Sequence, residues 1–235
     1  MTAPPFQLID QQPGFVLVNK APGIGFHQEN DADGLFQSVK STLQIDTLFP
    51  VHRLDKVTSG LIVFATDAAA ARELGEHFAH RQIDKYYLAL SRQKPKKKQG
   101  TIIGDMEKSR RGTWRLTRQR NNPAVTHFKS YGTPSGLRVF LLKPATGKTH
   151  QIRVALKSLG APIIGDPLYE SRTHNQPPAD RCYLHAFALS FTVQGKQFAY
   201  CNNPEAGELF RLPVIAKIIN EQLAPPWEIP LLSSL

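Results

Sequence analysis

The chain has 235 residues, of which 41% are hydrophobic, and this suffices for one large or two small domains with ordinary cores. Lys and Arg number 29 against 19 Asp and Glu, and the net charge of +10 favours a polyanionic partner, most simply nucleic acid, although membrane-surface binding or solubility alone would also fit. No signal segment and no apolar run of membrane-spanning length is visible in the sequence. The two cysteines lack metal-ligand spacing and are too few for a disulfide framework, so we expect both to be buried free thiols.

The first part of the chain predicts two strands and a loop between them that carries polar groups. Residues 14–20 (GFVLVNK) predict a strand that runs into a turn, and residues 61–65 (LIVFA) predict a buried strand. The charged stretch 52–59 is then a loop that feeds a core strand. Binding and catalytic groups tend to lie on such loops, but Asp55 considered alone would be a surface carboxylate paired with a neighbouring arginine or lysine.

A helix and a third strand are predicted next. Residues 68–79 favour a helix capped by Thr66 or Asp67. Residues 83–90 (IDKYYLAL) predict a strand, in which the side chains of the two adjacent tyrosines point to opposite faces.

Residues 91–120 form the most basic part of the chain. Eleven Lys and Arg residues stand there against Asp105 and Glu107, a balance of +9. We expect a basic loop over about 92–120, either as a solvated surface loop or as an arm that binds phosphates, and we favour RNA contact. The basic residues singled out for RNA contact are Lys96, Lys97, Lys98, Arg110 and Arg111.

The second half of the chain predicts mostly strands with two helices. Residues 125–142 favour a hairpin, residues 150–159 a helix capped by Thr149, residues 181–193 a strand, and residues 213–223 an amphipathic helix. Strands outnumber helices, and most connections are short. The pattern therefore predicts an α+β fold with a largely antiparallel sheet.

Two motifs in this chain resemble the signatures of the RluA family of RNA pseudouridine synthases. The first is residues 52–60 (HRLDKVTSG), and the second is residues 146–153 (TGKTHQIR). The resemblance implies that Asp55 is the catalytic residue, acting as nucleophile or base on a flipped-out uridine. It also implies that Arg153 forms a salt bridge with Asp55. Whether the attack falls on the uracil ring or on the ribose stays open.

The resemblance assigns roles to further residues. Tyr87, within a Lys-x-Tyr-x-Ala string, stacks on the target base, and Leu184 packs beneath it, although core packing explains Leu184 equally well. Arg53 fills the space that the flipped base leaves. Lys148 and His150 are assigned to RNA contact rather than to catalysis, and Lys148 keeps the charge of the family's more common arginine without its bidentate fork.

The resemblance implies the pseudouridine synthase fold: one catalytic domain over 1–235 with a core of about 14–223 and a mixed, mostly antiparallel sheet with flanking helices and loops. Many relatives carry an N-terminal S4 domain, but we expect none here because the first predicted core strand starts by Phe15. The expected activity is isomerisation of specific uridines in rRNA or tRNA. We expect no cofactor, no metal and no membrane association, and we expect a cytoplasmic monomer. The alternatives are a non-catalytic RNA-binding protein and, ranked last, a hydrolase that pairs Asp55 with a second carboxylate.

Overall fold

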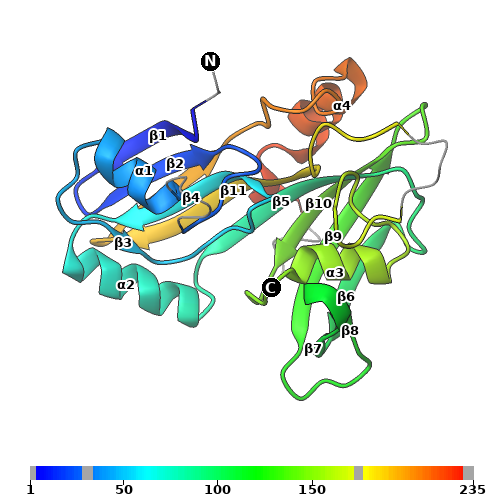
Figure 1. Ribbon diagram of the computed structural model, residues 1–235, viewed down its shortest axis with the longest axis horizontal. Coiled ribbons are helices and arrows are strands. Elements are labelled where there is room, and N and C mark those ends of the chain that lie inside the picture. The colour runs from blue at the N-terminus through cyan, green and yellow to red at the C-terminus, as the bar shows by residue number, and fades with distance from the viewer. Residues whose placement is uncertain (1–3, 28–33, 172–176, 230–235) are drawn as a thin grey trace. The chain divides into compact units, whose positions relative to one another are not determined.

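The computed structural model of the chain describes residues 4–27, 34–171 and 177–229 (Figure 1). These residues divide into two compact units. The first unit holds the chain up to Lys85 and the segment from His185 to Pro204, and the second holds the remainder. Strands outnumber helices in the described residues, which confirms the predicted α+β class.

The first unit is built on a mixed sheet. Its central strand, β4 (Ser59–Ala65), pairs antiparallel with β2 (Phe15–Lys20), where Leu17 lies opposite Val63. At its first two residues β4 pairs in parallel with β11 (Leu184–Val193), and at its last two it pairs antiparallel with β3 (Phe49–Pro50). The sheet also contains β1 (Phe6–Gln12), paired with β2, and β12 (Lys196–Cys201), paired with β11.

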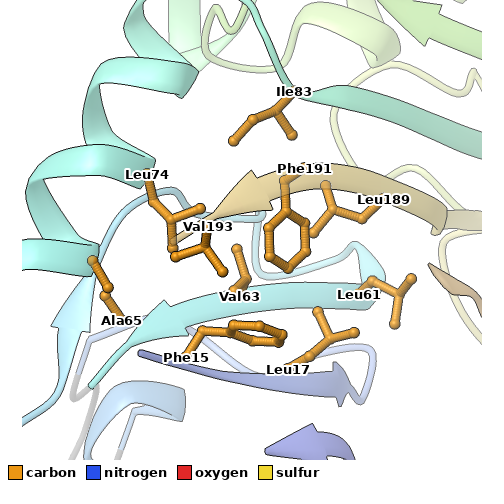
Figure 2. Close-up of a cluster of buried hydrophobic side chains, with 11 residues drawn as sticks. Phe15, Leu17, Leu61, Val63, Ala65, Leu74, Ile83, Leu189, Phe191 and Val193 are labelled. Atoms are coloured by element: carbon orange, nitrogen blue, oxygen red, sulfur yellow. The ribbon is translucent and has the colours of Figure 1, made fainter. Parts of the chain in front are cut away.

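Both faces of β4 are covered, and for that reason all seven of its residues are buried. On one face α2 (Ala68–Ala79) packs on the sheet, and on the other α1 (Leu35–Thr42) contributes Leu35 and Val39 to the core. Of the two predicted cap residues, Thr66 and Asp67, the N-cap of α2 is Asp67, which accepts the Ala70 N–H at 2.8 Å. Figure 2 shows the labelled side chains of the α2 face, namely Phe15, Leu17, Leu61, Val63, Ala65, Leu74, Ile83, Leu189, Phe191 and Val193.

The second unit contains an antiparallel sheet and a separate hairpin. Its strand order is β5 (Asp84–Ser91), β10 (Arg138–Pro144), β9 (Ala124–Gly132) and β6 (Gln99–Gly104). The two-stranded hairpin consists of β7 (Met106–Lys108) and β8 (Trp114–Leu116), with a short 3₁₀ turn at Arg110–Gly112 between them. The helices are α3 (Gln151–Ser158) and α4 (Pro213–Ile218), the latter continued by a π-turn at Ile219–Leu223 and followed by a 3₁₀ turn at Pro226–Glu228.

The structure corrects several local expectations. The segment 92–120 is not one loop, because it contains β6, β7 and β8, whose largely exposed or half-buried side chains give no apolar alternation in the sequence. His150, not Thr149, is the N-cap residue of α3. Cys182 is buried as expected, whereas Cys201 on β12 is exposed.

Candidate active site

The loop that carries Asp55 is attached to the core at its start by His52. The Val63 N–H donates to His52 Nε2 at 3.0 Å, and the His52 ring stacks on Phe78 with 4.5 Å between centroids. Burial, reinforced by the positive charge of Lys85, lowers the pKa of His52 from 6.5 to about 3. The imidazole is therefore neutral in the fold and can accept the backbone bond.

The bond from the Val63 N–H to His52 occurs at the edge of β4 that faces away from β2, at a point where no strand of the described residues pairs with that edge. β11 pairs with β4 only at Ser59 and Gly60, and β3 pairs only at Phe64 and Ala65. The N–H of Val63 lies between these two short pairings and would be a buried unsatisfied donor without His52. The side chain thus completes the strand edge and also fixes the entry to the loop.

A buried lysine holds the middle of the same loop. Lys20 is only 1% exposed, and its ammonium donates to the carbonyl oxygens of Ala21 and Ile24 at 2.9 Å and of Lys56 at 3.2 Å. The Gly23 N–H also donates to the Lys56 carbonyl, at 2.9 Å. The turn after β2 and the Asp55 loop are therefore held together by the buried Lys20 ammonium and by the Gly23 N–H.

The end of the loop is fixed by contacts between β4 and β11. Ser59 Oγ and His185 Nδ1 are 2.7 Å apart, and His185 Nε2 lies 2.8 Å from the Asn202 carbonyl. Since a carbonyl only accepts, Nε2 carries a proton and donates to Asn202. At Gly60, with φ at +111°, an added Cβ would lie 2.3 Å from the Ala186 carbonyl oxygen.

Asp55 therefore sits in a short, firmly attached loop. It is half-buried, and its carbonyl accepts the Thr58 N–H at 3.0 Å, which closes a turn directly after it. Arg53, two residues earlier, is exposed. The sequence predicted the loop and the strand that follows, but it did not predict the contacts of Lys20 or His185.

In the second unit, Tyr87 lies on β5 opposite Leu142 of β10 and is half-buried. Its neighbour Tyr86 is 1% exposed, and Lys143 Nζ lies 5.2 Å from the Tyr86 ring centroid. The different burial of the two tyrosines agrees with side chains on opposite faces of a strand. Leu184, the first residue of β11, is buried.

Arg153 lies on α3 and is buried, not on the helix surface. Its guanidinium forms a two-point ion pair with Asp166, from Nε at 2.8 Å and from Nη2 at 2.9 Å. Asp166 Oδ1 also accepts the N–H groups of Leu168, at 2.9 Å, and Tyr169, at 3.2 Å. The Arg153 carbon Cζ lies 5.1 Å from the Tyr169 ring centroid. The orientation of the guanidinium is thus fixed by a buried partner that the sequence did not reveal.

The loop before α3 is held by the side chain of Gln151. Its Oε1 accepts from Thr146 Oγ1 at 2.7 Å and from the Lys148 N–H at 3.0 Å. Its Nε2 donates to the Val125 carbonyl and to Thr126 Oγ1, both at 3.0 Å. This buried amide, on the first residue of α3, attaches the second motif to β9.

The polar residues beside this loop take different positions. Lys148 Nζ donates to Asn122 Oδ1 at 2.8 Å. His150 adopts a left-handed backbone conformation with φ at +56°, and its Nδ1 lies 2.9 Å from the Tyr169 hydroxyl oxygen.

The basic residues predicted to contact RNA are exposed. Arg110 and Arg111 lie at the tip of the β7–β8 hairpin, where Arg111 has φ at +55°. The three consecutive lysines, Lys96, Lys97 and Lys98, precede β6.

The first unit brings Arg53 and Asp55 together in one loop, and the second holds Tyr87, Lys148, His150 and Arg153. The predicted pair between Asp55 and Arg153 joins residues of different units and stays a prediction. Among the described residues no group of three or more His, Cys, Asp or Glu side chains could hold a metal ion. In the same part of the chain, no helix combines the length and apolar character needed to cross a bilayer.

Comparison with known proteins agrees with these motifs. The family model for RNA pseudouridylate synthase matches residues 14–158. An RNA pseudouridine synthase of Haemophilus influenzae is 44% identical over 221 residues, which cover 94% of this chain and 97% of the relative. The dual-specificity RNA pseudouridine synthase RluA of Pasteurella multocida is 32% identical over 198 residues, covering 81% of this chain and 88% of the relative.

A solved structure supports the same conclusion. Human RNA pseudouridylate synthase domain containing 1 superimposes with a TM-score of 0.70 at 27% identity, covering 85% of this chain and 83% of the human chain. The fold and the motifs thus define an RNA-modifying isomerase. The chain belongs to the RNA pseudouridylate synthase family, in its RluA group, whose members convert uridine in RNA to pseudouridine.

Proposed function

We propose that this chain converts specific uridines of ribosomal or transfer RNA to pseudouridine, with Asp55 as the reacting carboxylate. The observation that carries the proposal is the attachment of the Asp55 loop at its start, middle and end to buried groups. A loop held in this way places the backbone of Asp55 before the substrate arrives, which lowers the cost of reaching the reactive geometry. A relative named for the ribosomal large subunit supports ribosomal RNA, and a relative named for dual specificity supports a second RNA class. Transfer RNA is the second class that the resemblance to the RluA family implies.

The reaction exchanges one bond for another. The glycosidic bond between ribose C1′ and uracil N1 breaks, the base turns, and a bond forms between C1′ and C5. The proton on C5 then leaves and N1 takes up a proton, so that the product is an isomer of uridine. Asp55 serves as nucleophile or base during this exchange, and we assign Arg153 to pair with it and to favour its charged form. The bidentate contact with Asp166 supports this role, because it fixes the guanidinium plane.

The remaining residues bind the RNA and the flipped base. We assign Tyr87 to stack on the uracil and Leu184 to pack beneath it, since a base taken out of its helix needs an apolar, aromatic pocket. Arg53 is exposed beside Asp55, which supports its assignment to the gap in the RNA stack. Lys148, His150 and the exposed lysines and arginines 96–98, 110 and 111 are assigned to phosphate contacts.

We also propose that the protein acts as a monomer in the cytoplasm, where the proposed RNA substrates are found. Size-exclusion chromatography with light scattering tests the first point: a mass of 26.2 kDa supports a monomer, and twice that mass contradicts it.

The testing experiment is a pseudouridine map of total RNA from cells with and without this gene. Cells lacking it are complemented with wild type, Asp55→Asn, or the control Asp46→Asn, which changes an exposed carboxylate of the same unit. We expect one or more sites to be lost with the gene and restored by wild type and Asp46→Asn only. Purified Asp55→Asn should retain RNA affinity within a few-fold. Restoration by Asp55→Asn would refute the assignment and favour a different catalytic group.

A non-catalytic RNA-binding protein is the second candidate, and the surplus of exposed basic residues is the observation that favours it. It predicts an unchanged map. Single-site transcripts incubated with purified wild type then decide, because RNA binding without product would establish binding as the function.

A further inference from the structure

Tyr169 connects the basic hairpin of the second unit to Arg153, and neither motif assigns it a role. We call the basic hairpin β7, β8 and the residues 109–113 between them. We propose that Tyr169 is a positioning residue that couples RNA binding on the basic hairpin to the orientation of Arg153. The inference rests on the proposed roles of Arg153 and of the hairpin and adds the physical link between them.

The hydroxyl of Tyr169 joins two separate elements. The Trp114 backbone N–H, at the start of β8, donates to this oxygen at 2.9 Å. His150 Nδ1, just before α3, lies 2.9 Å from the same oxygen. Tyr169 is only 5% exposed and its partners Trp114 and His150 are half-buried, so both bonds are partly shielded from water. One phenol oxygen thus fixes the base of the hairpin against the start of the helix that carries Arg153.

The ring and backbone of Tyr169 contact the ion pair itself. The Arg153 guanidinium carbon lies 5.1 Å from the ring centroid, within the range of a cation–π interaction. The Tyr169 N–H donates at 3.2 Å to Asp166 Oδ1, the oxygen that also accepts from Arg153 Nη2. A displacement of Tyr169 therefore moves the aromatic ring that Arg153 contacts, and it also removes an N–H donor from the Asp166 carboxylate that pairs with Arg153.

His150, the partner of the Tyr169 hydroxyl, has a left-handed backbone, a conformation that is uncommon for residues with a Cβ atom although histidine adopts it more readily than most. Its contacts include the Tyr169 ring, which lies edge-on to the imidazole with 5.8 Å between centroids, in addition to the hydrogen bond. A tyrosine needed only for packing would not require a hydroxyl with partners on two elements.

The consequence for the reaction is a dependence of rate on RNA contact at the hairpin. Arg110 and Arg111 are exposed at the hairpin tip, while Trp114 at its base is bonded to Tyr169. Phosphates that order the hairpin also hold the Trp114 N–H in place, and Tyr169 transmits this order to Arg153. RNA that does not contact the hairpin leaves Arg153 held by Asp166 but without the further restraint that an ordered hairpin adds through Tyr169, so the hairpin influences the rate as well as the affinity.

The experiment compares Tyr169→Phe with wild type in single turnover. The variant removes the hydroxyl and keeps the ring over Arg153. The substrate is a transcript carrying a mapped target uridine labelled with tritium at C5, and the released tritium reports the reaction. We expect the saturating rate to fall about tenfold while the RNA Kd changes less than about threefold. The control Tyr200→Phe removes a hydroxyl bonded to Asp10 at 2.5 Å and should retain the wild-type rate.

A double-mutant comparison tests the coupling. Replacing Arg110 and Arg111 by Gln should lower both affinity and saturating rate in the wild-type background, but only affinity in the Tyr169→Phe background. An equal loss of rate in both backgrounds would overturn the inference, as would a wild-type rate in Tyr169→Phe.

Failure of this inference can be separated from failure of the proposed function. Arg153→Lys should lose rate because lysine cannot form the two-point contact. If it keeps the full rate, the role assigned to Arg153 is wrong. If it loses rate while Tyr169→Phe does not, only the coupling is wrong. Should Tyr169→Phe not fold, hydrogen exchange of the wild type decides: RNA must slow exchange in residues 165–170 as well as in the hairpin, and protection of the hairpin alone would refute the coupling.

Discussion

His52 should make the stability of the first unit depend on pH. The pKa of His52 is lowered from 6.5 to about 3 in the fold, chiefly by burial. Between these values the unfolded chain binds a proton that the folded chain does not. The contribution of neutral His52 is therefore fully present above pH 6.5 and is lost as the pH falls towards 3.

The size of the effect follows from the unfolded pKa alone once the pH stays above 3. A pH of 5 lies about 1.5 units below the pKa of the unfolded imidazole. At about 1.4 kcal/mol per unit, the free energy of unfolding therefore falls by about 2 kcal/mol. Burial of His127 also lowers its pKa, so the whole protein loses additional stability in acid. The quantity to measure is thus the difference between wild type and a variant that lacks only the His52 titration.

His52→Gln is that variant, because its amide oxygen can accept the Val63 N–H without binding a proton. Both proteins are unfolded with urea at pH 8 and pH 5 and followed by far-UV circular dichroism, since Trp114 and Trp227 both lie in the second unit. We expect wild type to lose about 2 kcal/mol more than His52→Gln between the two pH values. Equal losses would refute the reasoning. The control His80→Gln changes an exposed histidine of the same unit, and a similar rescue there would contradict the assignment to His52.

Three further perturbations test other parts of the structure. Lys20→Met leaves the Ala21 and Ile24 carbonyls without the ammonium donor and the Lys56 carbonyl with the Gly23 N–H as its remaining partner. It should cost about 3 kcal/mol in urea unfolding, with loss of turnover, and unchanged stability would show that the loop does not need the ammonium. Gly60→Ala places a Cβ against the Ala186 backbone and should destabilise by about 4 kcal/mol or prevent folding, whereas Gly75→Ala, with open space around its Cβ in α2, should gain up to about 1 kcal/mol; similar midpoints for both would contradict the steric argument. Replacing the lysines 96–98 by Gln should reduce the slope of log RNA association constant against log salt concentration by about 2 if all three contact phosphates. Filter binding at several salt concentrations measures this slope, and an unchanged slope would show that these lysines do not contact the RNA.

The parts of the fold that the sequence predicted are those with a local signature. The buried strand β4 follows from a run of apolar residues between Gly60 and Asp67, and α2 follows from its cap and its alanines. β1 was not predicted, because it lies at the sheet edge and buries only Phe6 fully. The strands of the basic segment were missed for the same reason: a strand with largely exposed side chains need not alternate.

The site was predicted where one motif contains the residue and was missed where two distant segments meet. Asp55 and Arg153 are recognisable from their neighbours in the sequence. The contact between Ser59 and His185 joins residues 126 positions apart, and no periodic pattern in the sequence predicts it. Lys20 was missed for another reason, since lysine is almost never fully buried and composition alone places it at the surface.

The ion pair between Arg153 and Asp166 is better explained by orientation than by stability. Taking both charges out of water costs several kcal/mol, and apolar residues of similar volume often stabilise a fold equally well. The pair is nonetheless buried, with both carboxylate oxygens engaged and two backbone N–H groups added to one of them. Such an arrangement holds a guanidinium in one plane, and Lys20 holds the Asp55 loop by a similar use of a buried charge. In each unit a buried charge therefore contacts the residue proposed for the reaction or the loop that carries it. This is expected when the buried groups serve to fix the geometry of the transition state rather than to add net stability.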